Sequence, residues 1–234
     1  MKRTSLVVGL LIIITNGYSQ TLQGNNNIST TFIGFQIGLT SCEMTGEQIN
    51  LELDNSGASF VRQNGLEIAF RVKHEFNNLF YFKSGVGFYQ KNGHVEGSRV
   101  IYPTHGPYNF LQIPILIGIQ PINLESSAFK LGLESGFSLN SLISTADDVT
   151  MGTYGDFDTK SIVPSFHLGV NLEIPINNKT SFNANYQYSK DLTYYYNRRL
   201  TYTHMGEEKF KDYDLWFKSY SISIGFIFKL NNEQ

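Results

Sequence analysis

The chain has 234 residues and a formal net charge of −2, and 41% of its residues are hydrophobic while 16% are charged. A mildly acidic chain lacks the basic surface by which proteins hold nucleic acid, which excludes nucleic acid as a partner. The single cysteine, Cys42, excludes an internal disulfide framework.

The N-terminal segment has the features of a cleavable export signal. Lys2 and Arg3 form a short basic region, and the ten residues Leu6–Thr15 form an apolar run. A retained membrane anchor is the alternative, but a helix needs about 20 apolar residues to cross a bilayer. We therefore predict a signal peptide over residues 1–19, with cleavage before Gln20 because small residues stand at the third and first positions upstream of it.

The remaining residues, 20–234, are expected to form one outer-membrane β-barrel domain, since all-β barrels commonly reach this length as a single domain. Its net charge is −4, because cleavage removes two basic residues and no acidic one. Eight segments of this domain alternate apolar and polar residues with the period of a β-strand. In chain order these are Thr31–Thr40, Leu66–Phe76, Phe80–Gln90, Asn109–Gln120, Phe129–Leu142, Ser161–Ile176, Thr180–Ser189 and Trp216–Leu230.

Short and long connections alternate between these strands. The short ones are Asn77–Leu79, Pro121–Ala128 and Asn177–Lys179; the long ones are Ser41–Gly65, Lys91–Tyr108, Ile143–Lys160 and Lys190–Leu215. Outer-membrane barrels have short periplasmic turns and longer outward loops. The pattern therefore predicts an all-β, eight-stranded antiparallel up-and-down transmembrane β-barrel in the cell outer membrane.

A soluble sandwich or lipocalin-type barrel would also alternate, with its apolar face buried and its polar face in water. The polar faces here are rich in Gly and Ser, which suits a crowded barrel interior. Aromatic residues gather at strand ends, where interfacial girdles are expected. The residues assigned to these girdles are Phe80, Tyr81, Tyr108, Phe110, Phe129, Tyr188, Trp216 and Phe217.

The charged residues of the strands are expected to point into the barrel, because Lys or Arg facing lipid at mid-membrane costs about 2–4 kcal/mol. The predicted inward set is Glu67, Arg71, Lys73, Lys83, Lys130, Glu134, His167, Glu173 and Lys229. This set could form a polar path for a solute or a plug of paired charges. An eight-stranded barrel is only wide enough for its own side chains, which favours the plug. Glu134 and Glu173 should then lie against basic partners.

Three residues depart from the strand pattern. Pro114 and Pro164 each remove a hydrogen-bond donor from a strand, and we interpret them as sites of β-bulges. Cys42 is the last residue of a short match to a lipoprotein processing box. No continuous apolar run precedes this match, so it is not read as a processing site. We therefore predict that Cys42 is a free thiol in a loop.

The segment Asn109–Ile119, NFLQIPILIGI, resembles the mid-barrel motif of the PorT-like outer-membrane β-barrel family of Bacteroidetes. The segments Phe35–Leu39, Tyr18–Gln20 and Ser221–Leu230 carry the same resemblance, which spans essentially the whole mature chain. It implies an eight-stranded outer-membrane barrel. The family's eponym is associated with a secretion system for surface and secreted proteins, and the resemblance implies no catalytic set.

Ser165, His167 and Glu173 share one strand face and could act as nucleophile, base and orienting acid in acyl transfer. Glu173, however, lies six residues from His167, about 20 Å along an extended strand. That distance prevents a direct hydrogen bond, so we expect no catalytic residues and no enzyme activity.

Two sets of outward residues could bind metal. His94, His105 and His204 would have to converge from separate loops to hold zinc or copper. Asp147, Asp148, Asp156 and Asp158 could hold calcium, but they lack the ordered spacing of a calcium loop. We therefore expect no metal site and no cofactor.

The fourth outward loop contains the candidate binding residues. Aromatic side chains are interleaved there with basic ones, and aromatic and arginine residues are enriched at binding surfaces. The candidates are Tyr194, Tyr195, Tyr196, Arg198 and Arg199. The alternative is that the last two strands simply extend beyond the membrane as a ribbon.

The sequence thus predicts a barrel with a side-chain-filled lumen and a structural or interaction role at the cell surface, or an accessory role in a secretion system. A narrow porin-like or solute-binding barrel is the alternative, and a lipid-modifying enzyme is a third. Expected partners are outer-membrane lipids and another envelope or secretion-system protein.

Overall fold

The computed structural model describes residues 29–46, 50, 57, 59–76, 79–96, 107–122, 129–145, 156–204 and 207–230. The predicted signal peptide, residues 1–19, lies outside the described residues. In these described ranges no helix is long and apolar enough to cross a membrane.

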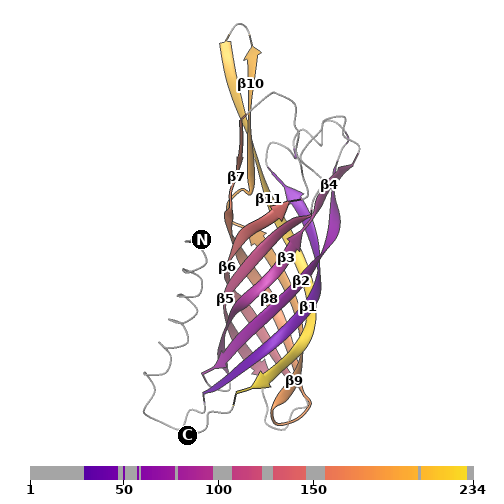
Figure 1. Ribbon diagram of the computed structural model, residues 1–234, viewed down its shortest axis with the longest axis vertical. Coiled ribbons are helices and arrows are strands. Elements are labelled where there is room, and N and C mark those ends of the chain that lie inside the picture. The colour runs from indigo at the N-terminus through magenta and orange to yellow at the C-terminus, as the bar shows by residue number, and fades with distance from the viewer. Residues whose placement is uncertain are drawn as a thin grey trace.

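Eight long strands form a closed antiparallel barrel (Figure 1). They are β1 (Thr30–Thr45), β2 (Ser59–Glu75), β3 (Phe80–Lys91), β5 (Tyr108–Ile122), β6 (Lys130–Thr145), β8 (Ile162–Pro175), β9 (Thr180–Asp191) and β11 (Glu207–Lys229). Each strand pairs with the next of these along the chain, and β1 pairs with β11 to close the barrel. The predicted fold class and strand count are confirmed.

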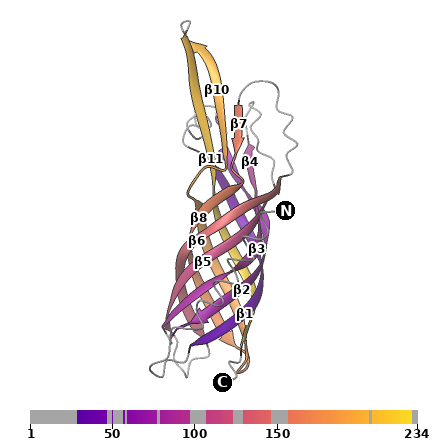
Figure 2. The same cartoon turned by 60° about the vertical axis from the view of Figure 1, so that its left-hand side comes forward.

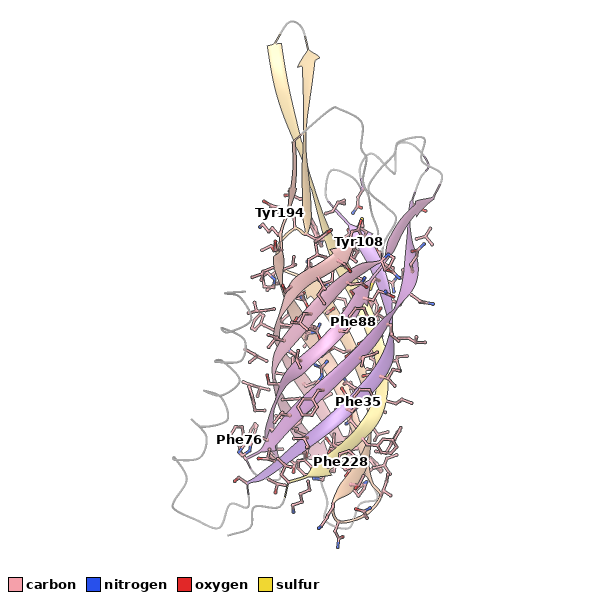
Figure 3. The ribbon with its side chains drawn as sticks, viewed as in Figure 1. Phe35, Phe76, Phe88, Tyr108, Tyr194 and Phe228 are labelled. Carbon is pink, nitrogen blue, oxygen red and sulfur yellow. The ribbon has the colours of Figure 1, made fainter. Side chains whose placement is uncertain are left out.

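The outer wall of the barrel is apolar. Alternate residues of each strand project outward, and large hydrophobic side chains stay exposed over the whole circumference, as Phe35 and Phe228 do in Figure 3. The exposed set includes Ile37, Leu39, Ile68, Phe70, Ile115, Ile117, Leu133, Phe137, Leu139, Leu168, Val170, Ile222, Ile224 and Phe226. A continuous apolar band on a closed barrel is the surface that acyl chains cover, so the wall spans a membrane. The soluble alternative is excluded, because it would bury these residues.

The strands run further outward than the alternation predicts. β1 continues to Thr45 and β2 begins at Ser59, where the short strand β4 (Gly93–Glu96) pairs with it. Cys42 consequently lies inside β1 and is fully buried, so its assignment to a loop was wrong. Its side chain has the inward orientation because it continues the polar face of the strand.

The proline prediction was also wrong. The pairing of β5 with β6 keeps one register across Pro114, and the pairing of β6 with β8 keeps one register across Pro164. At Pro114, the neighbouring Ser84 hydroxyl donates a 2.8 Å hydrogen bond to the proline carbonyl. Each strand therefore tolerates the absent N–H of its proline without the extra residue of a β-bulge.

The outward end carries a β-ribbon. β10 (Tyr196–His204) pairs with the first part of β11, and β7 (Asp156–Thr159) pairs with β10. In Figures 1 and 2 the β10–β11 hairpin projects beyond the barrel along its long axis. A ribbon past the membrane, the alternative for the fourth loop, is therefore present, but β9 ends at Asp191 and the separate strand β10 forms the ribbon with β11.

Candidate functional site: a charged lumen beneath an aromatic cap

Ion pairs fill the periplasmic end of the lumen. The Lys73 ammonium donates to Glu75 at 2.8 Å and also pairs with Glu173 from the opposite side of the barrel. Lys130 lies 3.3 Å from Glu75, whose Oε1 also accepts a hydrogen bond from Gln120 at 3.2 Å. Every carboxylate in this layer thus has at least one cationic partner, as predicted for Glu173.

The middle of the lumen contains two further pairs. Lys83 lies 2.5 Å from Glu134, and the Tyr81 hydroxyl donates to the same carboxylate at 3.2 Å. Arg71 pairs with Glu67 on its own strand at 3.0 Å. All of these side chains are buried. The predicted basic partner of Glu134 is therefore Lys83.

A third layer lies at the outward end. The Lys91 ammonium is 2.5 Å from Asp191 Oδ1, which also accepts a hydrogen bond from Ser165 at 2.6 Å. The other carboxylate oxygen of Asp191 accepts the backbone N–H of Phe217 at 3.1 Å. Lys91 also lies over the ring of Phe110, 5.0 Å from its centroid, which is the geometry of a cation–π contact.

Above this layer an aromatic cap closes the outward mouth. It consists of the buried side chains of Cys42, Met44, Tyr108, Phe110, Val163, Tyr195, Leu215 and Phe217. The Tyr108 and Tyr195 rings meet edge to face with centroids 4.9 Å apart. Figure 3 shows Tyr108 at the mouth and Tyr194 at the base of the ribbon.

The girdle assignment was wrong for four aromatic residues. Tyr81, Tyr108, Phe110 and Phe217 point into the barrel and are almost completely buried, whereas Phe80 and Phe129 are exposed on the wall as expected. Position near a strand end does not decide the environment of a side chain. The face of the strand decides it.

Charge is balanced among the described lumenal ion pairs. The acidic members are Glu67, Glu75, Glu134, Glu173 and Asp191, and the basic members are Arg71, Lys73, Lys83, Lys91 and Lys130. An unpaired buried charge is strongly unfavourable. A charged interior that holds no counter-ion therefore needs equal numbers of acidic and basic side chains. Of the two predicted arrangements, a polar path for a solute and a plug of paired charges, these contacts form the plug. The predicted inward residue Lys229 differs, because it is exposed at the periplasmic rim.

Sequence reasoning missed Glu75, Lys91 and Asp191. Lys91 and Asp191 were assigned to long loops, although each is on the same face as the inward residue two positions before it. Extending the two-residue period by one step would have found both. Glu75 lies on the inward face of a predicted strand and shares the parity of Arg71 and Lys73.

Ser165, His167 and Glu173 do not form a catalytic triad in the structure. Ser165 donates to Asp191, while His167 Nε2 lies 2.6 Å from the Ser138 hydroxyl. Glu173 belongs to the periplasmic layer. All three side chains are buried, and the cap lies between Ser165 and the outward mouth.

The outward metal candidates lie largely outside what the structure describes. His105, Asp147 and Asp148 are not among the described residues, and the side chains of the other four are not described either. No group of three or more metal-binding side chains occurs in the described part of the chain. The backbone register places Arg199 of β10 opposite Asp156 of β7 and opposite Asp212 of β11.

The candidate binding residues of the fourth loop separate into two groups. Tyr195 is buried in the cap, and Tyr194 lies beside it with the Lys160 ammonium 3.8 Å above its ring centroid. Tyr196, Arg198 and Arg199 belong to β10, in the ribbon, and their side chains lie outside the described part. Tyr195 therefore belongs to the cap, and Tyr196, Arg198 and Arg199 stay predicted binding residues of the ribbon.

No protein-family model and no curated protein matches this chain. Solved structures do. The outer membrane protein OprG from Pseudomonas aeruginosa is 12% identical with a TM-score of 0.55, over 90% of this chain and all of that chain. Neisserial surface protein A is 12% identical with a TM-score of 0.47, over 85% of this chain and 97% of its own. The protein AlkL is 14% identical with a TM-score of 0.46, over 92% and 96%.

The likeness to OprG shows the fold, an eight-stranded outer-membrane β-barrel. The exposed apolar band agrees with it independently, because a closed barrel with lipid-facing residues is one of two architectures that can span a membrane. The chain is therefore an outer-membrane barrel.

Proposed function

We propose that this barrel is closed to solutes and serves as a structural anchor that presents its β10–β11 ribbon to a partner at the cell surface. The observation that carries the proposal is the filled lumen. Three layers of paired charges and an aromatic cap occupy it in succession. A conducting path would require these pairs to separate, and each separation leaves a buried charge without a partner.

Planar-bilayer recording tests the closed lumen. The purified protein, reconstituted with its orientation controlled, is expected to give no conductance steps over the accessible voltage range. A porin recorded in the same bilayer provides the positive control. Reproducible steps that change in size in a Lys83→Ala/Glu134→Ala variant would assign the current to this lumen and contradict the proposal.

The resemblance of Asn109–Ile119 to PorT-like barrels supports a secretion-system protein as the partner. A photo-crosslinking amino acid at Tyr202 of β10, introduced in the native host, tests the ribbon. We expect a discrete adduct with an envelope or secretion-system protein. The matched control is the same amino acid at Asn178 in a periplasmic turn. Adducts of the same identity from both positions, or none from Tyr202, would count against a ribbon-mediated interaction.

We further propose that the chain is not an enzyme. Ser165 and His167 are both buried beneath the cap, and each is bonded to a different partner. A lipid substrate would have to displace the cap to reach the Ser165 hydroxyl. An unchanged lipid profile after Ser165→Ala and His167→Ala is the expected result.

A further inference from the structure

The outer wall carries a cationic patch just above its apolar band. Lys190 of β9, Lys218 of β11 and Arg62 of β2 lie on the outward-projecting face of their strands, together with Glu43 of β1. We call these four residues the rim patch. Lys218 is directly opposite Lys190 on one side and Glu43 on the other, and Glu43 pairs with Arg62, so the patch follows one row across four adjacent strands.

The rows beneath the rim patch show its depth in the membrane. One step toward the periplasm, Tyr188 faces Tyr220, with ring centroids 5.2 Å apart. The next step pairs Tyr186 with Ile222, both exposed, and continues into the apolar band. Tyrosines mark the interface between acyl chains and head groups in membrane barrels. The rim patch therefore lies at the level of the outer-leaflet head groups.

The rim patch holds more positive than negative charge. Arg62 is neutralised locally, since its guanidinium lies 2.9 Å from Glu43 and 4.8 Å from the centroid of the Tyr220 ring. Within the described residues, neither Lys190 nor Lys218 forms an ion pair. Like charges directly opposite one another on a sheet are destabilising, so an anion bound between them would remove a repulsion.

Among the described residues of β3, β5 and β6, across the barrel, a row of outward-facing polar side chains carries no charge. Its members are two amides and a hydroxyl. Gln90 donates to Asn109 at 3.0 Å, and Asn109 donates to Ser144 at 3.0 Å. These groups satisfy one another along the wall. The rim patch thus lies on the β9–β11–β1–β2 side, while the described row on β3, β5 and β6 is uncharged.

We propose that the rim patch is a binding site for the phosphate group of an anionic lipid in the outer leaflet, held by Lys190 and Lys218. The tyrosine row below would contact the lipid's interfacial region, and the exposed Ile222 and Leu168 would contact its acyl chains. The site depends on the barrel's position in the membrane and does not depend on whether the lumen conducts.

Native mass spectrometry of the protein in neutral detergent micelles tests the site with three probes. These are a bisphosphorylated disaccharide lipid (lipid A), zwitterionic phosphatidylcholine, and inorganic phosphate. We expect the wild-type protein to retain lipid A in preference to phosphatidylcholine. A Lys190→Gln/Lys218→Gln variant should bind lipid A about 30-fold more weakly, because each lysine near an anionic membrane surface contributes about a factor of five.

A matched control removes the same charge at the other rim. Lys179→Gln/Lys229→Gln changes two exposed lysines at the periplasmic end and should leave lipid A binding unchanged. An equal loss of lipid A binding in both variants would show that only the net charge of the protein matters, and would overturn the site. Equal retention of lipid A and phosphatidylcholine by the wild type would also overturn it. Binding of inorganic phosphate without lipid A would assign the lysines to a free anion and overturn the lipid proposal.

Discussion

Lys83 and Glu134 meet in the lumen although 51 residues separate them in the chain. Each is on the inward face of its strand, where the alternation of apolar and polar residues places it. The alternation explains why both are inside. It does not explain why they face each other, which follows from the stagger of β3, β5 and β6 around the barrel.

At this scale we predict strong coupling between the two residues. Lys83→Met alone should lower the free energy of unfolding by about 3–5 kcal/mol, because it leaves Glu134 buried without its cation. The Lys83→Met/Glu134→Gln double variant should lose much less than the sum of the single variants. Chemical denaturation in lipid vesicles measures the stability of the wild type, the two single variants and the double variant, which together form a double-mutant cycle. Additive losses would show that the two side chains do not depend on each other.

Each strand of the barrel has one face toward lipid and one toward the lumen, and β11 shows this over its final residues. Ile222, Ile224 and Phe226 are exposed on the wall, while Ser221 and Ser223 are buried inside. A shift of one residue would exchange the two sets. The sequence therefore specifies the register of the strand wherever both faces are distinctive.

We predict that a charge on the lipid face of β11 is tolerated according to its depth. Ile224→Lys, near mid-membrane, should destabilise the folded barrel by about 2–4 kcal/mol, because the ammonium faces acyl chains. Leu230→Lys, on the same face at the periplasmic end, should cost about 0–1 kcal/mol. Denaturant titration in vesicles compares the two. Equal costs would indicate that this face does not contact the hydrocarbon core.

At the scale of the whole molecule, the described residues form a barrel and a ribbon that share one strand. Residues Trp216–Lys229 of β11 pair with β1, whereas Glu207–Leu215 pair with β10. The ribbon contributes Tyr195 and Leu215 at its base to the aromatic cap, and the remainder projects outward. Barrel closure therefore does not require the outer part of the ribbon.

We predict that the ribbon can be shortened without unfolding the barrel. Asn197 and Asp214 are directly opposite each other, so an Asn-Gly turn can replace residues 198–213. The shortened chain should retain heat-modifiable migration on gels and an unchanged denaturation midpoint. It should also lose any adduct that the ribbon forms with a partner. A chain that fails to close into a barrel would show that the ribbon takes part in folding.

The sequence by itself determined the number of barrel strands, their faces and the alternation of short and long connections. These properties follow from a period of two residues, which is local and visible in any single strand. It also predicted that Glu134 and Glu173 have basic partners, because burial of an unpaired charge is costly.

Only the tertiary structure decided which charges meet and what closes the mouth. Lys91 and Asp191 are 100 residues apart, and Tyr195 enters the cap from a connection between strands. Such contacts depend on the tilt and stagger with which eight strands close into a barrel. No single strand contains that information, so neither the layers of ion pairs nor the rim patch can be read from one segment.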